Sequence, residues 1–445
     1  MRSSGFSLFK PFGNRLRKVL ILVIGQGARE HAIVATLLKD SGVEVVCAPG
    51  NPGIAEIARV AHVNSNDSAE VVALAKDFNV DLVVIGPEAP LVAGVGDSLR
   101  EAGIAVFGPS KAAAALEGSK AFAKEIMEAA GVPTAAARYC VTVDEASAAL
   151  DTFGAPYVVK DDGLAAGKGV VVTNDRAEAL RHALACIDSR DGGAVVIEEF
   201  LAGPEVSLFG VSDGTTIVPL TPAQDFKRVS DNDAGPNTGG MGAYSPLPWA
   251  PENFVTEVTK NVLQPMIDEM KRRGTPFVGL LFAGLAITSS GVRVIEFNAR
   301  FGDPETQVVL ARLDSPLSEL LMAAATGKLS EQPELKWKSE SAVTVVMAAD
   351  GYPDSPVLGA VISGIQDAQA QGLSVYQAGT KANEFGKITV NGGRVLSITA
   401  TGKDLTGARS KAYAGIETIE FDGEHHRSDI ALKAALGEIR LGDVS

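Results

Sequence analysis

One short segment of the chain carries an acid, an amide and a guanidinium on alternating residues, at Glu296, Asn298 and Arg300. Alternate residues of a β-strand face the same side, so these three would share one face while Ile295 and Phe297 point into the core. A carboxylate and an amide oxygen suit Mg²⁺, and a guanidinium suits a phosphate that the metal bridges. A solvated strand face with one salt bridge is the alternative, but the tight turn that follows at once favours a designed site.

A glycine-rich hairpin tip is predicted between two β-branched runs, in the segment Lys160–Val170. Gly163, Gly167 and Gly169 would let the backbone approach a polyphosphate closely, and Lys168 would add positive charge. The segment lacks the spacing of a Walker loop. An ordinary flexible hairpin is the alternative, and the lysines on both sides of the glycines argue against it.

An earlier glycine cluster, Gly25–His31, follows an apolar run and opens a helical pattern, so its backbone N–H groups could hold a phosphate. It is a poor dinucleotide fingerprint, because Glu30 stands at the third glycine position. The second apolar run ends in Cys47-Ala48-Pro49 and offers no acid to hold a ribose. A nicotinamide enzyme is therefore disfavoured, which leaves a phosphate-binding loop or a tight turn without a ligand.

A long glycine- and proline-rich stretch, Gln224–Pro248, is expected to lack regular secondary structure. Asp225, Lys227 and Arg228 stand near its start, and Asn237–Gly242 lies near its middle. Structureless loops of that length inside a compact protein are usually functional or disordered. The charged side chains and glycines favour recognition of a small polar substrate, with a plain surface loop as the alternative.

The N-terminal part must position the first glycine cluster, and there apolar runs alternate with turns and helical patterns. This alternation predicts βαβ units with a parallel sheet. The expected strands are Val19–Ile24, Val43–Cys47, Asp81–Ile85 and Ile104–Phe107. A helix is expected over Ser119–Ala130, with Ser119 as its cap.

Three strand-rich blocks follow that helix. The first is predicted to contain the strands Pro156–Val159, Gly169–Thr173 and Val195–Phe200. The second is predicted to contain Val206–Val211, Phe282–Thr288 and Val292–Phe297. The third begins near Glu334 and is predicted to contain Ala342–Ala348, Gly359–Ile362, Val375–Ala378 and Val395–Ala400, a turn at Asn391–Gly393, and a helix from about Leu405.

The chain is thus expected to be α/β and α+β and to have several domains. The expected division is a basic extension (1–17), an N-terminal parallel-sheet α/β domain (18–118), a central domain (119–333) with a subdomain at about 131–200, and a small C-terminal mixed β domain (334–445). The extension contains no acid, as a transit peptide would. The apolar run after it leads straight into a glycine loop, which favours a first strand preceded by a disordered extension.

Composition excludes several classes of function. The 445 residues carry a formal net charge of −14, which argues against a nucleic-acid partner. Cys47, Cys140 and Cys186 form no CxxC pair, so neither a disulfide framework nor a zinc site is expected, and a cytoplasmic location is the simplest interpretation. No apolar run approaches the ~20 residues of a membrane helix, so no membrane partner is expected.

Together these segments resemble the ATP-grasp superfamily and, within it, the phosphoribosylamine–glycine ligase family. The resemblance runs from about Val19 to near the C-terminus and implies a pre-ATP-grasp N-terminal domain and a two-part ATP-grasp domain with its lid at 131–200. Asn237–Tyr244 and Arg300–Glu305 are the most specific stretches. The other matching segments are Gly25–His31, Gly86–Leu91, Leu116–Phe122, Asp162–Val170, Glu198–Leu201, Gly235–Pro246, Glu296–Gln307 and Asn391–Leu396.

The resemblance implies a site for ATP and a divalent metal. Lys120 and Lys160 would contact the phosphates beneath the hairpin Asp162–Gly169, while Glu296 and Asn298 would hold Mg²⁺ or Mn²⁺. The other residues implied to bind the nucleotide are Gly163, Gly167, Lys168, Gly169, Glu198, Glu199, Phe200, Leu201, Glu205 and Asn237.

It also implies catalytic and substrate-binding residues. Arg300 would steady the charge on the transferred phosphoryl group, with Lys160 and Asp225 as further catalytic candidates. The candidates for substrate contacts are Gly25, Gly27, Arg29, Glu30, Pro87, Glu88, Asp225, Lys227, Arg228, Gly239, Gly240, Met241, Arg300 and Asp303.

The implied reaction joins glycine to phosphoribosylamine in purine biosynthesis. The glycine carboxylate attacks the γ-phosphoryl group to give glycyl phosphate and ADP, and the amine of phosphoribosylamine then displaces phosphate. Such chemistry mainly needs positioning and charge neutralisation. A monomer or a weak dimer is expected. The alternatives are another ATP-grasp carboxylate–amine ligase and a nucleotide-binding scaffold without activity.

Two positions depart from the family pattern. Asp161 stands where alanine is usual after the lysine, which would lower phosphate affinity unless the side chain points outward. Tyr376-Gln377 stands where a Phe-His pair is common, which argues against histidine chemistry at that place.

Overall fold

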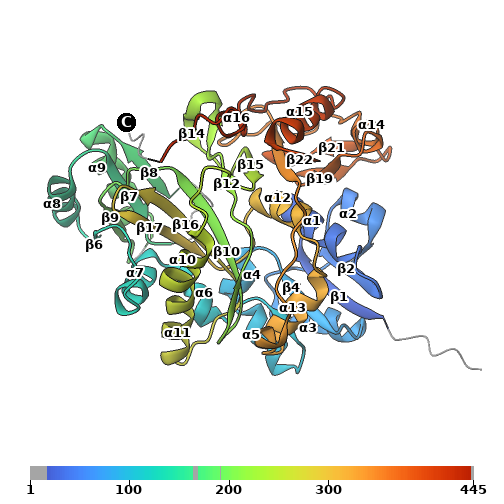
Figure 1. The fold of residues 1–445 in the computed structure, drawn as a ribbon, viewed down its shortest axis with the longest axis horizontal. Helices are drawn as coiled ribbons and strands as arrows, with labels where there is room; N and C mark the ends of the chain where they lie inside the picture. Colours follow the sequence, from blue (N-terminus) through green and yellow to red (C-terminus); the bar gives the residue numbers. More distant parts are fainter. Residues whose placement is uncertain (1–17, 164–168, 191, 442–445) are drawn as a thin grey trace, which may run out of the picture.

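The computed structural model describes residues 18–163, 169–190 and 192–441. The basic extension and two predicted nucleotide contacts, Gly167 and Lys168, lie outside the described residues. Figure 1 shows the N-terminal unit in blue below the C-terminal unit in orange and red, with the central strands beside both. No helix in the described ranges is long and apolar enough to span a membrane.

The N-terminal unit is a parallel sheet, as the strand–helix alternation predicted, with strand order β3-β2-β1-β4-β5. The middle strand is continuously apolar because helices cover both faces of such a sheet. The strands are β1 (Val19–Gly25), β2 (Val43–Pro49), β3 (Arg59–Val60), β4 (Leu82–Ile85) and β5 (Val106–Phe107). The helices are α1 (Ala28–Leu37), α2 (Pro52–Ile57), α3 (Ser68–Asp77), α4 (Glu88–Ala93), α5 (Val95–Glu101) and α6 (Lys111–Gly118).

A linking helix and a small antiparallel sheet follow. Helix α7 (Lys120–Ala129) begins where predicted, and Ser119 caps it by accepting a hydrogen bond from the backbone N–H of Phe122. The small sheet has the order β6-β9-β7-β8 and its own apolar core. Its elements are β6 (Ala137–Cys140), α8 (Val143–Phe153), β7 (Tyr157–Asp161), β8 (Val170–Thr173), α9 (Arg176–Asp188) and β9 (Val195–Glu198).

The central sheet is antiparallel and ends in the strand that carries the acid and the amide. Its order is β11-β10-β16-β17. The strands are β10 (Glu205–Asp213), β11 (Ile217–Pro219), β16 (Val278–Thr288) and β17 (Gly291–Asn298). The helices of this part of the chain are α10 (Phe254–Val258), a π-helical turn (Thr259–Leu263), α11 (Gln264–Arg272), α12 (Glu305–Arg312) and α13 (Leu317–Ala325).

Strand β17 corrects one predicted orientation. Ile295 does not point into the core: it is only partly buried, whereas Val294 and Phe297 are fully buried. The register shows why, because Gly284 pairs with Glu296 and the next residue, Leu285, pairs with Val294. Ile295 is therefore the extra residue of a β-bulge, which breaks the simple alternation of faces.

The long stretch Gln224–Pro248 is not structureless. It contains β12 (Gln224–Asp225), β13 (Arg228–Ser230), β14 (Ala234–Asn237) and β15 (Gly242–Ser245). Strand β15 pairs with β18 (Ser341–Ala348), so this stretch completes the C-terminal sheet, whose order is β12-β15-β18-β22-β19. These strands are short and pair with distant segments, which local sequence patterns do not reveal.

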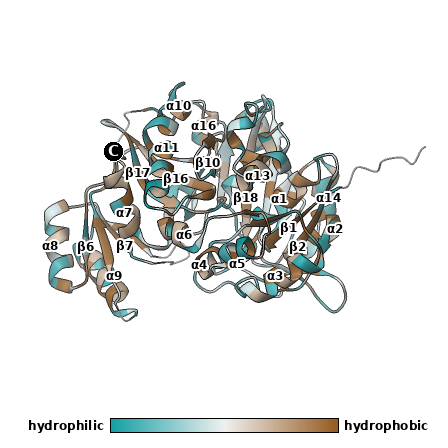
Figure 2. Ribbon diagram, turned by 90° about the horizontal axis from the view of Figure 1, so that it is seen from below, coloured by the Kyte–Doolittle hydropathy of each residue, from teal (hydrophilic) through white to brown (hydrophobic). Residues whose placement is uncertain are grey.

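The rest of the C-terminal unit largely follows its predicted pattern. Its elements are α14 (Ile365–Ala370), β19 (Ser374–Gln377), β20 (Thr380–Ala382), β21 (Ile388–Val390), β22 (Arg394–Gly402), α15 (Leu405–Ile416) and α16 (Leu432–Ala435). The predicted strand at Gly359–Ile362 is wrong, because Gly359 takes a φ of +99° and only an isolated bridge, Val361 to Thr389, forms there. Figure 2 shows hydrophobic residues concentrated on the sheet strands of every unit.

Candidate functional site

The metal-binding candidates lie where α7 meets β17. Lys120, the first residue of α7, places its Nζ 2.9 Å from Oε2 of Glu296. The Lys120 charge, together with Lys160, holds the pKa of Glu296 well below its ordinary value against the effect of burial. Asn298 is buried at the end of the strand and makes no side-chain hydrogen bond within the described part of the chain. An ionised carboxylate and an uncommitted amide oxygen therefore occupy the end of β17.

Lys160 is held beside this pair by a buried acid. Its Nζ lies 2.8 Å from Glu198 Oε2 and donates to the carbonyl of Ile295 at 2.8 Å. Lys124 contacts the other carboxylate oxygen of Glu198 at 3.1 Å. Glu198 is also one of the residues implied to bind the nucleotide. Its carboxylate lies 3% exposed between two lysines, so its side chain orients Lys160.

The remaining nucleotide candidates in the described ranges lie at the end of β9, at the start of β10 and beside β8. Glu199 pairs with Arg293 at 3.0 Å, and Phe200 and Leu201 follow, with Phe200 45% exposed. Glu205 begins β10 and pairs with Lys227 at 2.6 Å, while the amide nitrogen of Asn237 donates to the carbonyl of Val170 at 3.4 Å. These residues thus form a path that joins β9, β10 and the strand that follows the glycine hairpin.

Asp161, which departs from the family pattern, points away from Lys160. Its carboxylate binds Arg190 at 2.7 Å, and that guanidinium also donates to the carbonyl of Asp162. A side chain on Gly163 would meet Arg190 at 3.0 Å. Gly169 accepts the backbone N–H of Asp161 through its carbonyl, which closes the described base of the hairpin. The ion pair to Arg190 therefore neutralises the unusual acid.

Arg300 lies between two acids of the N-terminal unit. Its guanidinium contacts Glu88 at 3.3 Å and Glu117 at 3.1 Å. Burial opposes the charge on Arg300, but these carboxylates outweigh it and raise the pKa further. Burial likewise opposes the charge on Glu88, and Arg300 outweighs it, so the pKa of Glu88 is lowered. Pro87 precedes Glu88 as the N-cap of α4, which places that helix start at Arg300.

A second cluster contains a residue that sequence reasoning missed. Asp225 lies 3.4 Å from Lys227, and burial raises the pKa of Asp225 despite that lysine. Glu305, at the start of α12, is 4% exposed, and burial followed by the Asp225 charge raises its pKa to about 7. Ser207 donates to Glu305 at 3.4 Å. The acid of Arg300–Glu305 was visible in the sequence, but its burial beside Asp225 was not.

The first glycine loop surrounds an acid of its own chain. The N–H of Gly27 donates to Glu30 Oε2 at 2.7 Å, and Arg29 donates to Glu30 Oε1 at 2.5 Å. A Cβ on Gly25 would lie 2.4 Å from the Glu30 side chain, and one on Gly86 would lie 2.1 Å from it. The glycines therefore make room for a buried carboxylate, and the Gly27 N–H is already used.

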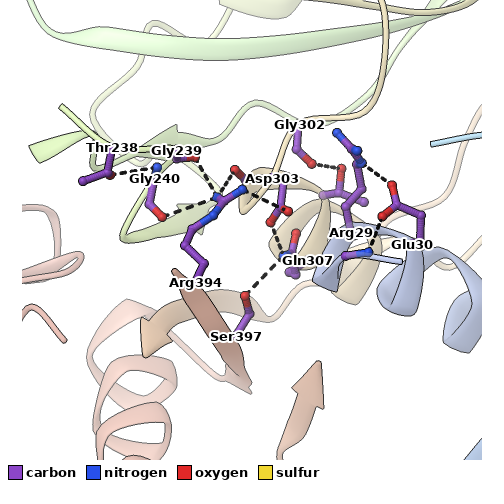
Figure 3. A network of polar contacts seen from close by, with 12 residues as sticks. Arg29, Glu30, Thr238, Gly239, Gly240, Gly302, Asp303, Gln307, Arg394 and Ser397 are labelled. Atoms are coloured by element: carbon purple, nitrogen blue, oxygen red, sulfur yellow. Dashed lines mark hydrogen bonds and ion pairs between the residues drawn. The ribbon is translucent and has the colours of Figure 1, made fainter. Parts of the chain in front are cut away.

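Residues of the long stretch fall into two groups. Gly239 and Gly240 lie against Asp303 and Arg394 in a network that also includes Gln307 (Figure 3). Arg394 was not among the predicted site residues, although its segment was singled out. Met241 is completely buried and packs in the core. Arg228 donates to the carbonyl of Gly235 and so stabilises the β13–β14 hairpin.

The donor set fits a nucleotide with a divalent cation. Two lysines and one arginine supply positive charge, and Glu296 with Asn298 supplies two hard oxygens of the kind that Mg²⁺ prefers. Within the described ranges no cluster of three or more His, Cys, Asp or Glu side chains could hold a metal. A cation here would thus need further oxygens, which polyphosphates commonly supply.

Models of one protein family match most of the chain. Models of the phosphoribosylglycinamide synthetase N domain, ATP-grasp (A) domain and C domain match residues 19–117, 118–306 and 342–433. The chain is 62% identical to the phosphoribosylamine–glycine ligase of Streptomyces coelicolor, over 93% of this chain and 99% of that protein. It is 54% identical to the enzyme of that name from Mycobacterium tuberculosis strain H37Rv, over 95% of this chain and all of that protein.

Solved structures show the same architecture. The crystal structure of phosphoribosylamine–glycine ligase from Thermotoga maritima superposes with a TM-score of 0.80 at 32% identity, covering 93% of this chain and 100% of that one. The biotin carboxylase domain of 2-oxoglutarate carboxylase from Hydrogenobacter thermophilus superposes with a TM-score of 0.69 at 18% identity, covering 92% of this chain and 91% of that one. The second likeness concerns the fold alone.

Proposed function

This chain belongs to the phosphoribosylglycinamide synthetase family, and we propose which residues perform its ATP-dependent ligation of glycine to 5-phosphoribosylamine. The observation that carries the proposal is the group formed by Lys120, Glu296 and Asn298, with the buried Lys160 beside it. This group combines cations for phosphate oxygens with hard oxygens for a metal, which phosphoryl transfer requires.

We assign the nucleotide site to the path from β9 to the hairpin. Lys120 and Lys160 bind the phosphates, and Glu198 keeps Lys160 extended toward them. The other residues assigned to the nucleotide are Gly163, Gly167, Lys168, Gly169, Glu199, Phe200, Leu201, Glu205 and Asn237. Glu296 and Asn298 hold the divalent cation, for which Mg²⁺ is the first choice and Mn²⁺ the second. Bound there, the cation neutralises charge on the phosphate oxygens.

We assign the chemistry to groups that stabilise charge. Transfer of the γ-phosphoryl group of ATP to the glycine carboxylate releases ADP and makes an acyl phosphate. Phosphate then leaves when the amine attacks the carbonyl carbon and loses a proton. Arg300 is assigned to the charge that develops on the phosphoryl group. Glu88 and Glu117 keep its guanidinium fixed and charged for this role. Asp225 and Lys227 lie with Glu205 at the edge of the same region, where they contact the substrate.

The substrate contacts are assigned to three segments, of which the first glycine loop and Gly239–Gly240 approach Asp303 while Glu88 contacts Arg300. They are the loop with Gly25, Gly27, Arg29 and Glu30, the segment Pro87–Glu88, and the turn Gly239–Gly240. We further propose that the chain works in the cytoplasm as a monomer or weak dimer without nucleic acid. Its proposed domains are 18–118, 119–333 with the lid at 131–200, and 334–445, after an extension at 1–17.

Replacing Glu296 tests the metal assignment. We expect Glu296→Ala to lower kcat for ADP release by at least about a thousandfold, because a metal ligand and the partner of Lys120 are lost together. Glu257→Ala, an exposed acid in α10, serves as the matched control and should leave turnover unchanged. ADP release is followed with glycine, phosphoribosylamine and ATP while Mg²⁺ or Mn²⁺ is varied. A folded Glu296→Ala protein with unchanged activity would remove Glu296 from the site.

A further inference from the structure

The side chain of Arg394, in the C-terminal sheet, contacts both of the most specific segments of the sequence. It begins β22, and its NH1 group donates to the carbonyl of Gly239 at 2.7 Å and to that of Asp303 at 2.6 Å. Its NH2 group contacts the Asp303 carboxylate at 3.2 Å (Figure 3). One guanidinium therefore fixes the backbone of two segments that are distant in sequence, together with one side chain.

Both oxygens of the Asp303 carboxylate are held. Arg394 contacts Oδ2, and the side-chain amide of Gln307, which is fully buried, donates to Oδ1 at 2.8 Å. A Cβ built on Gly27 would lie 3.7 Å from Oδ2, so the carboxylate lies beside the first glycine loop. The orientation of Asp303 toward the N-terminal unit thus depends on a residue of the C-terminal unit.

A second contact from the same unit holds Gly239. Its N–H donates to the Tyr352 hydroxyl at 2.9 Å. The Tyr352 ring lies against Gly393, where a Cβ would be 2.2 Å from the ring. Gly393 must therefore lack a side chain for Tyr352 and the neighbouring Arg394 to approach the same turn. This gives a role to Asn391–Leu396, a segment that the site residues leave unexplained.

We propose that Arg394 is a positioning residue that holds Gly239–Gly240 and Asp303 in the arrangement that receives the non-nucleotide substrates. It acts on the substrates through those groups and, among the residues that the structure describes, makes no hydrogen bond or ion pair with those assigned to the nucleotide. The inference rests on the proposed function, which assigns Asp303 and the two glycines to substrate contacts. A lysine would keep the charge but lose the planar fork that reaches two carbonyls and a carboxylate at once.

The test compares Arg394→Gln and Arg394→Lys with the unmodified full-length chain. ADP release is measured while glycine and phosphoribosylamine are varied, and the Kd of ADP is measured separately by calorimetry. We expect Arg394→Gln to raise the KM of at least one of the two substrates about tenfold or more, with Arg394→Lys intermediate. The Kd of ADP should stay within about twofold, which a general loss of structure would not permit.

Three further variants separate the possible causes. Arg409→Gln is the control, because Arg409 lies on α15 of the same unit and also donates to backbone carbonyls, of Ile430 and Ser428, yet should leave both KM values unchanged. Tyr352→Phe removes one hydrogen bond to Gly239 and should raise the same KM as Arg394→Gln by a smaller factor, which keeps the proposal testable if Arg394→Gln does not fold. Asp303→Asn tests the substrate site on its own.

The outcomes differ for each claim. If Asp303→Asn leaves both KM values unchanged, the proposed substrate contact is wrong. If Asp303→Asn raises a KM and the Arg394 variants do not, the contact stands and the positioning role is wrong. If ADP binding weakens in Arg394→Lys as much as a KM rises, Arg394 supports the whole structure, and the proposal is overturned.

Discussion

Glu305 is buried at the start of α12, and its pKa rises to about 7 because burial, and then the Asp225 charge, disfavour ionisation. Near neutral pH this carboxyl group is thus partly protonated, unlike Glu296, whose pKa is lowered by Lys120. Two acids a few residues apart in the sequence therefore differ in charge. The ionised Glu296 is suited to binding a cation, whereas the partly protonated Glu305 is suited to sharing a proton.

The raised pKa of Glu305 makes a stability prediction with a definite sign. Its folded-state pKa of about 7 exceeds the ordinary value of 4.5, so its contribution to stability is complete below pH 4.5 and is lost as the pH rises through 7. We expect Glu305→Gln to raise the melting temperature relative to the unmodified chain at pH 8 and to have little or the opposite effect at pH 4.5. Melting curves over that range measure it.

The control is Glu56→Gln, because Glu56 is an exposed acid on α2. Its replacement should change the melting temperature by the same amount at both pH values. Equal shifts for Glu305→Gln at pH 4.5 and pH 8 would mean that folding does not raise the pKa of Glu305.

Single residues also show how far the sequence could predict the site. The spacing of Glu296 and Asn298 revealed the metal-binding candidates because strand periodicity is local. The role of Glu198 as the partner of Lys160 could not be predicted, because it depends on the pairing of β7 with β9. Arg394 was missed for the same reason: its partners come from two other segments of the chain. The prediction that Ile295 points into the core was wrong because the local sequence does not indicate a β-bulge.

Among the elements, α7 connects stability to nucleotide binding. Its cap, Ser119, accepts from the N–H of Phe122 at 3.1 Å and donates to Asp162 at 3.0 Å, which ties the helix start to the base of the hairpin. Lys120 follows immediately. The order of the first helical turn therefore decides where the Lys120 ammonium group lies relative to Glu296.

Replacing the cap of α7 should affect both properties. We expect Ser119→Ala to lower the free energy of unfolding by about 1 kcal/mol, as loss of an N-cap usually does. We also expect it to weaken ATP binding several-fold, because Lys120 and Asp162 lose a fixed position. The control is Thr142→Ala, which removes the cap of α8 but touches no proposed nucleotide contact. If both variants weaken ATP binding equally, the effect comes from a general loss of stability and not from Lys120.

The elements themselves were predicted where burial is continuous and local. Strands such as β1 and β18 are runs of buried apolar residues, and α7 has a capping serine before an amphipathic pattern. The short strands β12 to β15 were missed because their order comes from partners elsewhere, with glycines and charges that locally favour a loop. Tertiary pairing overrode local preference there.

At the scale of the whole molecule, a buried histidine joins the N-terminal and C-terminal units. His31 of α1 accepts the N–H of Gln377 on Nδ1 at 3.0 Å, and its ring meets the edge of Tyr376 at 5.4 Å. Asn51 donates to the Gln377 carbonyl at 2.7 Å. Gln377, where the family often has histidine, is itself buried in this contact.

This contact predicts loss of stability in acid. Burial lowers the pKa of His31 from 6.5 to about 4, so its contribution is complete above pH 6.5 and is lost as the pH falls toward 4. The loss should approach about 1.4 kcal/mol per pH unit across that window. His31→Gln should flatten the dependence measured by denaturant unfolding, whereas His62→Gln, an exposed histidine, should not. An unchanged slope in His31→Gln would show that other groups cause the acid sensitivity.

The pairing of β15 with β18 has a consequence for dissecting the protein. A fragment starting at residue 334 would contain β18 but not β15, so one side of β18 would present unpaired N–H and C=O groups to other chains. Such open edges favour intermolecular pairing and precipitation. A fragment ending at 333 would carry the buried strand β15 without its partner β18. The boundary between these units in sequence is therefore not a place where the polypeptide can be divided into two soluble halves.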